Sequence, residues 1–378
     1  MPSDPQGDTT SKAETSDTHK GFGARHRRAA MSLLLGAVAC GFVYYVLPQI
    51  AGLGPTLRLL RRGNPWWLAL GVPLEALSFV GYVALFHCVF SADRGRIGWS
   101  ASAQISMAGD MATKLFATAG AGGLALYVWA LRAAGLSPGT VGQRMVCFEV
   151  LNYAVYMGAL AICGIGLWSG LFAGSAPPAL TLVPALFGAL VILVAISMLW
   201  LAGPVERYML RREAQVGKRA ARLWHRGAAY PRALQSGLRC ALELLRGGDR
   251  SWLGVIPAWA CDIAVLWACF RAFGDSPPGP VLVMGYYVGT LGNALPTPAG
   301  IGGVEGGMIG AFLGFGVHGS LAVLAVLAYR TISYWLPTVP GAIAYVQLRR
   351  TVGRWRTDGP PPSSGNTRPE KDPAVQPV

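Results

Sequence analysis

The sequence predicts an all-α polytopic membrane protein made of inverted repeats, with about six full spans plus two re-entrant helical hairpins, a set that can also be counted as seven or eight transmembrane segments. Hydrophobic residues make up 53% of the 378 residues and charged residues only 13%, whereas about a quarter of the residues of a typical soluble domain are charged. Several apolar runs approach or exceed the ~20 residues that cross a bilayer as a helix. Two glycine-rich segments between them are too short to cross and return.

The formal net charge of +14 does not indicate a nucleic-acid partner, because the basic residues flank apolar runs instead of alternating with aromatic residues. We therefore expect membrane lipids as partners, with anionic headgroups. The seven cysteines form no CxxC pair and the five histidines are scattered, so we expect no metal and no cofactor.

Basic clusters at the two ends of the apolar region predict the orientation. "RHRR" at 25–28 and "RRTVGRWR" at 349–356 place both termini in the cytoplasm and the protein in the inner (cytoplasmic) membrane. Residues 1–24 and 351–378 are polar and read as disordered cytoplasmic tails around a transmembrane domain at 25–350. The predicted spans are 29–47, 66–90, 141–167, 179–202, 252–273 and 320–339.

The segment 203–250 is the strongest topological anchor. It holds eleven Lys or Arg residues against four acidic ones, which predicts a cytoplasmic loop of one or two amphipathic helices lying on anionic lipid.

Counting crossings between these anchors produces the hairpins. The chain must be inside at about residues 98 and 138, yet Ser100 to Leu131 is only 32 residues, too few for two spans. In the second half, Pro280 to Phe315 must begin and end outside, and its arms are only 16 and 14 residues long. We expect one hairpin that opens inward, with its apex at 117–123, and one that opens outward, with its apex at 293–307.

The two halves are related by a displacement of 180 residues. Repeat one covers about 66–168 and repeat two about 252–340, and inverted repeats with broken helices are typical of transporters. The displacement aligns two glycine triplets that we take as candidate substrate-binding positions: Gly120, Gly122 and Gly123 with Gly300, Gly302 and Gly303.

The second apex, "NALPTPAGIGGVEGG", combines helix breakers with a carboxylate. Pro296 and Pro298 cannot continue a helix. Glycines recur every four residues from Gly302 to Gly314, which predicts close helix packing along that stripe. A dinucleotide-binding loop is not indicated, because Glu305 takes the place of the last glycine and no strand precedes it.

Charged residues inside predicted spans or hairpins are the candidate polar site. Each costs roughly 2.5 to 3.5 kcal/mol at the bilayer centre, so such residues face one another or a wet cavity. Two interpretations stay open: structural ion pairs (Glu305 with Arg330, Asp110 with Lys114), or a mid-membrane site where helix N-termini and a cation bind an anionic headgroup. The residues are Glu75, Asp110, Lys114, Glu149, Asp262, Glu305 and Arg330.

"LPTPAGIGGVEGG" followed by "LAYRTISYWLPTVPG" resembles the transmembrane, flippase-like region of lysylphosphatidylglycerol synthases, the family UPF0104. Ala299 replaces the usual glycine, and Thr118 stands in the first repeat where a proline is usual. The resemblance covers roughly residues 30–350. The matching positions are Pro296, Pro298, Gly300, Gly302, Glu305, Tyr329, Arg330, Tyr334, Trp335 and Pro337.

The resemblance implies lipid handling, and Tyr334 joins the substrate-binding candidates through it. The founding members carry an additional cytoplasmic aminoacyltransferase domain, so aminoacylation is not expected of this chain. We expect a non-enzymatic flippase or transporter that moves an anionic or polyprenyl-linked lipid. The alternatives are a membrane transferase with Glu305, Asp262 or Asp110 as general base, and a scaffold that recruits partners through 203–250.

Overall fold

The computed structural model describes residues 62–91, 96–115, 121–213, 218–247, 251–294 and 302–357. Helices make up this part of the chain, and five of them are long and apolar enough to cross a membrane. They coincide with five of the six predicted spans; the sixth, at 29–47, lies outside the described residues. The five are Pro65–Phe90, Pro138–Trp168, Pro178–Arg212, Val255–Phe273 and Gly319–Thr357.

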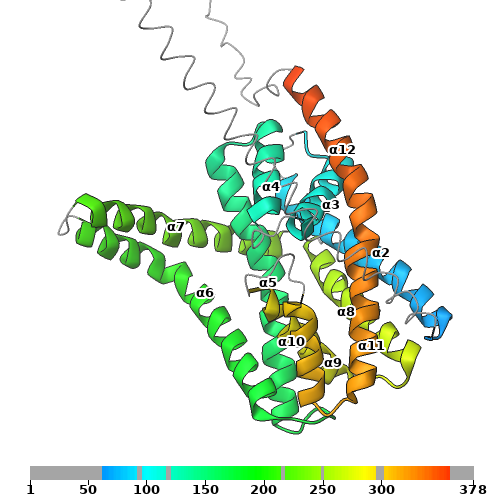
Figure 1. The fold of residues 1–378 in the computed structure, drawn as a ribbon. Helices are drawn as coiled ribbons and strands as arrows, with labels where there is room; N and C mark the ends of the chain where they lie inside the picture. Colours follow the sequence, from blue (N-terminus) through cyan, green and yellow to red (C-terminus); the bar gives the residue numbers. More distant parts are fainter. Residues whose placement is uncertain are drawn as a thin grey trace, which may run out of the picture. The chain divides into compact units, whose positions relative to one another are not determined.

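The helices follow one another in a pattern that occurs twice. Repeat one is a long helix, two short helices and a long helix (Figure 1). Repeat two has the same order, with the run Gly319–Thr357 as its second long helix. The first set is α2 (Pro65–Phe90), α3 (Trp99–Leu115), α4 (Ala121–Ala133) and α5 (Pro138–Trp168); α6 (Pro178–Glu213) and α7 (Lys218–Arg246) connect it to α8 (Val255–Phe273), α9 (Gly279–Thr290), α10 (Gly303–Gly314), α11 (Gly319–Arg330) and α12 (Leu336–Thr357).

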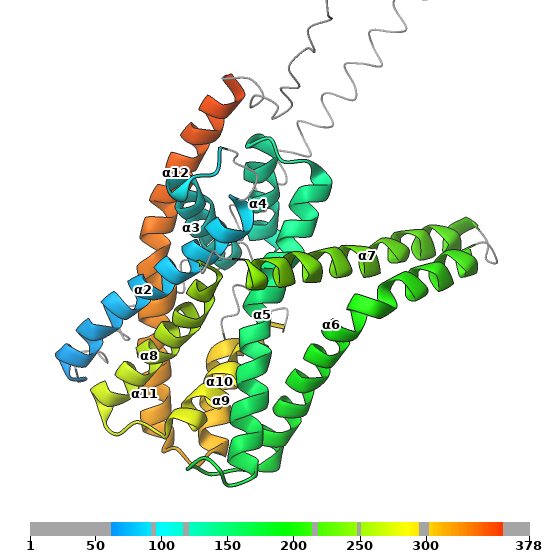
Figure 2. The ribbon, with the colours of Figure 1, turned by 180° about the vertical axis from the view of Figure 1, so that it is seen from behind.

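The short helices form two hairpins at opposite ends of the bundle. Both views place α3 and α4 toward the end where α12 finishes, and α9 and α10 toward the other end (Figures 1 and 2). We call the first the basic end, because the last two turns of α12 carry Arg349, Arg350, Arg354 and Arg356. The hairpins therefore open in opposite directions, as the crossing count requires.

Equivalent glycines end the second arm of each hairpin. Gly135 and Gly316, which the repeat aligns with one residue of drift, have φ of 103° and 83°. Each is followed by an N–H that reaches back five residues, from Leu136 to Leu131 (3.2 Å) and from Val317 to Phe312 (2.9 Å). This is the Schellman arrangement, which satisfies carbonyls that a helix end leaves open.

Helices of each repeat pack against helices of the other repeat. α3 of repeat one lies against α12 of repeat two, and α9 of repeat two lies against α5 of repeat one. The hydroxyl of Tyr156 on α5 donates to the carbonyl of Tyr287 on α9 at 2.8 Å. Each hairpin is thus held by the last long helix of the other repeat.

Close approach within the hairpins depends on glycines other than the predicted stripe. A Cβ at Gly307 would lie 3.0 Å from the carbonyl oxygen of Gly289, and a Cβ at Gly123 would lie 2.7 Å from that of Gly109. No described atom lies within 4 Å of a Cβ built at Gly306 or Gly310. The expected close packing is therefore wrong at Gly306 and Gly310, because α10 turns Gly303 and Gly307 toward its partner instead. It is confirmed at Gly314, where a Cβ would come into close contact with the side chain of Leu180 on α6.

Two helices extend beyond their predicted ends. α6 continues to Glu213, so the basic segment 203–250 begins inside a transmembrane helix and returns as α7. α12 continues to Thr357, so residues 351–357 are helical and not part of a tail. Val352 is buried there, and Arg96 donates to the carbonyl of Trp355 at 2.5 Å. These contacts stabilise residues 351–357, which the sequence predicts to be part of a disordered tail because of their charge.

Gly289→Ala should destabilise the second hairpin. The added Cβ would lie 2.8 Å from the Cα and the amide nitrogen of Met308, which are backbone atoms that cannot rotate away. We expect a loss of about 1 to 3 kcal/mol, seen as a lower Tm in detergent. Gly310→Ala on the next helix is the control and should be neutral or stabilising by up to about 1 kcal/mol. Equal Tm values for the two variants would contradict this packing.

Candidate functional site

Glu305 and Arg330 form an ion pair between α10 and the end of α11. Arg330 Nε donates to Glu305 Oε1 at 2.7 Å, and each side chain is 17% exposed. The other oxygen, Oε2, accepts the N–H of Gly302 at 2.7 Å. Both oxygens of one carboxylate are therefore engaged, one by a side chain and one by a helix start.

The backbone on both sides of the pair departs from regular α-helix. Gly302 has φ of 81° and begins α10, so Glu305 is the third residue of the helix and caps it. Directly after Arg330, residues Thr331–Trp335 form a π-helical turn, a feature frequent at functional sites. Within that turn the ring of Tyr334 lies 5.1 Å below the Arg330 guanidinium.

The helix lengths give the distance of the pair from the helix ends. Arg330 is the eleventh residue after Gly319 at the start of its helix, about 17 Å along the axis. Glu305 is ten residues before Phe315, about 15 Å. Half the thickness of the hydrocarbon core is about 15 Å. The predicted mid-membrane position of these two residues agrees with the helix lengths.

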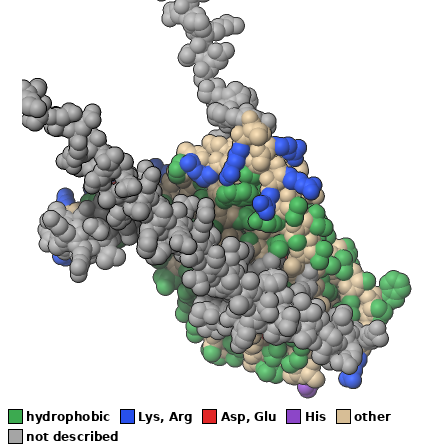
Figure 3. Space-filling model, turned by 45° about the horizontal axis from the view of Figure 1, so that its top comes forward, with side chains coloured by type: hydrophobic (Ala, Val, Ile, Leu, Met, Phe, Trp, Pro, Cys, Tyr) green, Lys and Arg blue, Asp and Glu red, His purple; other side chains and the backbone are tan. Residues whose placement is uncertain are grey.

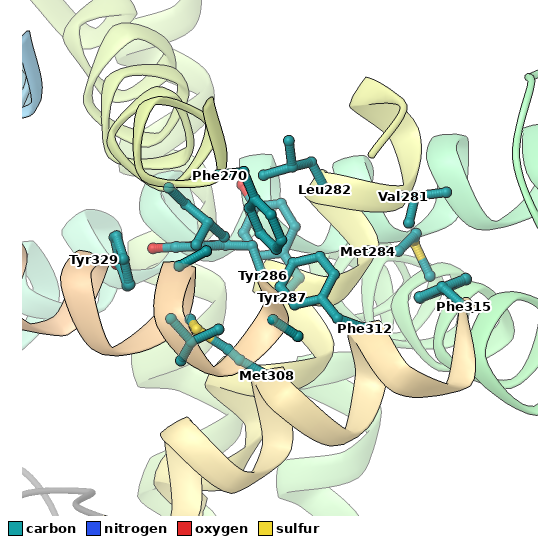
Figure 4. Packing of buried hydrophobic residues seen from close by; sticks show 14 of the residues in the cluster. Phe270, Val281, Leu282, Met284, Tyr286, Tyr287, Met308, Phe312, Phe315 and Tyr329 are labelled. Atoms are coloured by element: carbon teal, nitrogen blue, oxygen red, sulfur yellow. The ribbon is translucent and has the colours of Figure 1, made fainter. Parts of the chain in front are cut away.

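Asp262 on α8 is held by two tyrosines. Tyr286 donates to Asp262 Oδ2 at 2.5 Å, and Tyr329 donates to Oδ1 at 3.0 Å. Figure 4 shows both tyrosines in the buried cluster that also holds Tyr287, Met308 and Phe312. Tyr329 directly precedes Arg330 on α11, so the Asp262 carboxylate and the Glu305 carboxylate are bound by adjacent residues of the same helical turn.

Repeat one contributes a second polar group. The hydroxyls of Tyr82 and Tyr127 are 3.3 Å apart, and both lie within electrostatic range of Asp110 and Glu149. Tyr334 connects the two halves, because Asp110 on α3, Arg330 on α11 and Glu305 on α10 all lie within electrostatic range of its hydroxyl.

The structure brings most of the predicted residues near one another through the contacts described above. We call this group the charged layer: Asp110, Glu149, Asp262, Glu305, Arg330 and Tyr334. Gly302 and Gly303 begin α10, and Gly122 and Gly123 lie in the first turn of α4. Gly120 and Gly300 fall outside the described residues, as do the two predicted apex prolines. The side chain of Lys114 is also outside that part, so its pair with Asp110 stays a prediction.

Sequence reasoning missed the aromatic half of the site. Trp259 donates to Asn152 at 3.1 Å, and its ring packs against Tyr156, Tyr286 and Tyr287. A charge search cannot find these residues, because tyrosine and tryptophan are ordinary in a membrane helix. The signal that could have found them is the adjacent pair Tyr286–Tyr287 in a hairpin arm too short to span the bilayer.

Comparison with known proteins identifies similar sequences. The family model described as lysylphosphatidylglycerol synthase TM region matches residues 29–341. A UPF0104 membrane protein of Methanothermobacter thermautotrophicus is 24% identical over 343 residues, which cover 85% of this chain and 94% of that protein. A further match to a UPF0104 membrane protein of that organism is 32% identical over 117 residues, 29% of this chain and 35% of that protein.

Arg330→Met should destabilise the protein more than the loss of an exposed ion pair. It leaves the Glu305 carboxylate largely buried without its cation, which costs about 3 to 5 kcal/mol in a fully buried pair and somewhat less here. The control is Arg271→Met, whose partner Asp275 is 94% exposed, with an expected cost below about 1 kcal/mol.

Denaturation of the single variants and of Glu305→Gln/Arg330→Met completes a double-mutant cycle. The double variant should recover part of the loss, because no unpaired charge remains. Additive losses would show that the two residues do not interact.

Proposed function

The chain belongs to the family of the lysylphosphatidylglycerol synthase transmembrane region, and from this premise we propose that it translocates a phosphate-bearing, anionic lipid between the leaflets of the membrane. The observation that carries the proposal is the Glu305–Arg330 pair, in which each side chain is only 17% exposed and which we expect at mid-depth in the membrane. A cation at this depth costs free energy unless it is paired with an anion or binds a substrate.

Exchange of partners is the central step. A phosphate that reaches Arg330 replaces Glu305 as the acceptor of its hydrogen bond, and the guanidinium can hold it through two parallel donors. Glu305 keeps the N–H of Gly302, so its carboxylate does not become isolated when the arginine turns away. Nearby Asp110 and Asp262 repel a second anion, which favours transit of the headgroup over its retention.

The repeat architecture supports alternating access. Two hairpins that open in opposite directions give each side of the membrane its own moving element, as in transporters with inverted repeats. We assign the basic end to the cytoplasm and the protein to the cytoplasmic membrane, since arginines concentrate on the cytoplasmic flanks of spans.

A lipid-linked transferase is the second candidate function. The observation that favours it is Asp262, whose two oxygens accept hydrogen bonds from Tyr286 and Tyr329, an arrangement that can orient a general base. Purified protein incubated with a polyprenyl-phosphate sugar distinguishes the two. Release of a modified lipid that depends on Asp262 would support the transferase.

Glu305→Gln/Arg330→Gln should abolish most translocation while the protein stays folded. Removal of both charges leaves no unpaired ion, and loss of a charge-assisted contact to phosphate, about 1.5 to 3 kcal/mol, lowers the rate by about tenfold or more. The assay follows fluorescent phosphatidylglycerol in proteoliposomes.

Asp275→Asn removes one partner of the exposed pair and is the matched control, expected to keep the wild-type rate. A double variant that moves lipid at the wild-type rate would contradict the assignment of this site.

A further inference from the structure

A hollow opens between α3 and α12, away from the charged layer. Its volume is about 230 Å³. Because α3 belongs to repeat one and α12 to repeat two, the hollow lies in one of the two seams along which the repeats exchange partners. The lining residues are Ser100, Ala103, Gln104, Met107, Pro340, Ile343, Ala344 and Gln347.

The lining changes from polar to apolar along the seam. At the basic end, Gln104 donates to Ser100 at 3.3 Å and accepts from Thr351 at 2.9 Å. Toward the middle of the bundle the walls are Met107 and Pro340. A polar mouth above an apolar floor matches the order of headgroup and acyl chain in a lipid.

The depth of the hollow matches the headgroup layer. Pro340 is ten residues beyond Arg330 on the same helical run and Gln347 seventeen, about 15 and 26 Å along the axis. With Arg330 at mid-depth, the hydrocarbon core ends at about 15 Å and the headgroup region at about 20 to 22 Å. Pro340 therefore lies where the hydrocarbon core ends, and Gln347 lies just beyond the headgroup region.

Two arginines stand over the mouth of the hollow. At about 100° per residue, Arg350 and Arg354 lie on the side of α12 that carries Gln347, whereas Arg349 and Arg356 lie on the opposite side. All four are exposed. Figure 3 shows Lys and Arg side chains gathered at this end of the molecule, beside hydrophobic side chains. Arg350 and Arg354 lie about 5 and 10 Å beyond Gln347 along the axis, so their long side chains have to extend back toward the mouth of the hollow to reach an anionic headgroup there.

The equivalent seam between α9 and α5 is filled. The repeat places Met284 where α3 has Gln104, and Tyr287 where α3 has Met107. Met284 is fully buried, and its methyl group would lie 3.3 Å from a Cβ at Gly164 on α5. The ring of Tyr287 lies 4.4 Å from that of Tyr156. The seam at the basic end thus has room where its counterpart does not.

We propose that the α3–α12 hollow seats an anionic glycerophospholipid from the leaflet at the basic end, with its phosphate near Arg350 and Arg354. This inference rests on the proposed function, for which it is the loading site. At the floor of the hollow, a Cβ at Gly341 would lie 2.8 Å from Met111, so the seam closes there. Asp110 directly precedes Met111 on α3, and it lies within electrostatic range of Tyr334. The hollow therefore leads toward the charged layer, and Gly341 marks the constriction that must open.

Lipid retention on the full chain tests the seat directly. Ile343→Trp fills the hollow. Val346→Trp on the same helix, about 60° around the axis from Ile343 and about 110° from the middle of the lining, adds equal bulk outside it; Ile343 and Val346 are 55% and 50% exposed. Native mass spectrometry after addition of phosphatidylglycerol should show retained lipid on the wild type and on Val346→Trp and its loss from Ile343→Trp. Equal retention by the two tryptophan variants would overturn the site.

Charge variants test the identity of the occupant. Arg350→Gln/Arg354→Gln should lower phosphatidylglycerol retention by about fivefold per arginine. Arg349→Gln/Arg356→Gln removes equal charge from the opposite face and should leave retention unchanged. Phosphatidylcholine should bind more weakly than phosphatidylglycerol to the wild type and equally to all variants. Equal retention of the two lipids by the wild type would overturn an anionic occupant.

The retention assay and the translocation assay test the lipid seat and the proposed function separately. If the hollow variants lose bound lipid while wild-type protein moves none in proteoliposomes, the seat stands and the proposed function falls. If Glu305→Gln/Arg330→Gln stops translocation while Ile343→Trp keeps the wild-type rate and its lipid, the proposed function stands and the seat is wrong.

Discussion

The middle of a bilayer offers no water to a backbone amide or a carboxylate, and the Glu305 carboxylate meets both demands at once. Its two oxygens satisfy the first N–H of a broken helix and the guanidinium of Arg330, each at 2.7 Å. Without the carboxylate, the start of α10 would expose an unsatisfied amide at a depth where each such group costs several kcal/mol. Without the broken helix, Glu305 would lack its second donor. The hairpin and the charge therefore depend on one another.

The two repeats share their backbone geometry but not their charged residues. The starts of the hairpin helices and of the helix after each hairpin follow the repeat within a residue or two. So do the Schellman turns and the glycine contacts, as Gly109 with Gly289 and Gly135 with Gly316 show. Charged positions do not. The residue equivalent to Arg330 is Glu149, with one residue of drift. The first long helices of the two repeats align with a displacement of 184, as Pro73 with Pro257 shows, so the residue equivalent to Asp262 is Ser78, which donates to a carbonyl of α8 at 2.8 Å. Packing constrains the scaffold of both repeats, whereas the position that holds the cation Arg330 in repeat two holds the carboxylate Glu149 in repeat one.

The architecture was predictable because it follows from lengths and signs of charge. Arms of 16 and 14 residues cannot span a bilayer whatever their neighbours are, so the hairpin of α9 and α10 follows from counting. Contacts between distant helices were not predictable in this way. Glycine every four residues suggested packing along Gly302–Gly314, but the face that a helix turns to its partner depends on the partner. Gly307 meets Gly289, and Gly303 meets Gly292, instead. Tyr286 and Tyr329 likewise acquire meaning only because α9 and α11 bring them to Asp262.

The π-helical turn at Thr331–Trp335 relates the charged layer to the seam at the basic end. A π turn holds about one residue more than an α turn, so it rotates all that follows by about 100° relative to an uninterrupted helix. The face of α12 that meets α3 is therefore set by a local irregularity that begins directly after Arg330 and contains Tyr334. Tyr334 also lies within range of Asp110 on one hairpin and Glu305 on the other. The five residues of the π-helical turn thus follow the ion pair directly and precede the helix that forms one wall of the lipid-facing seam.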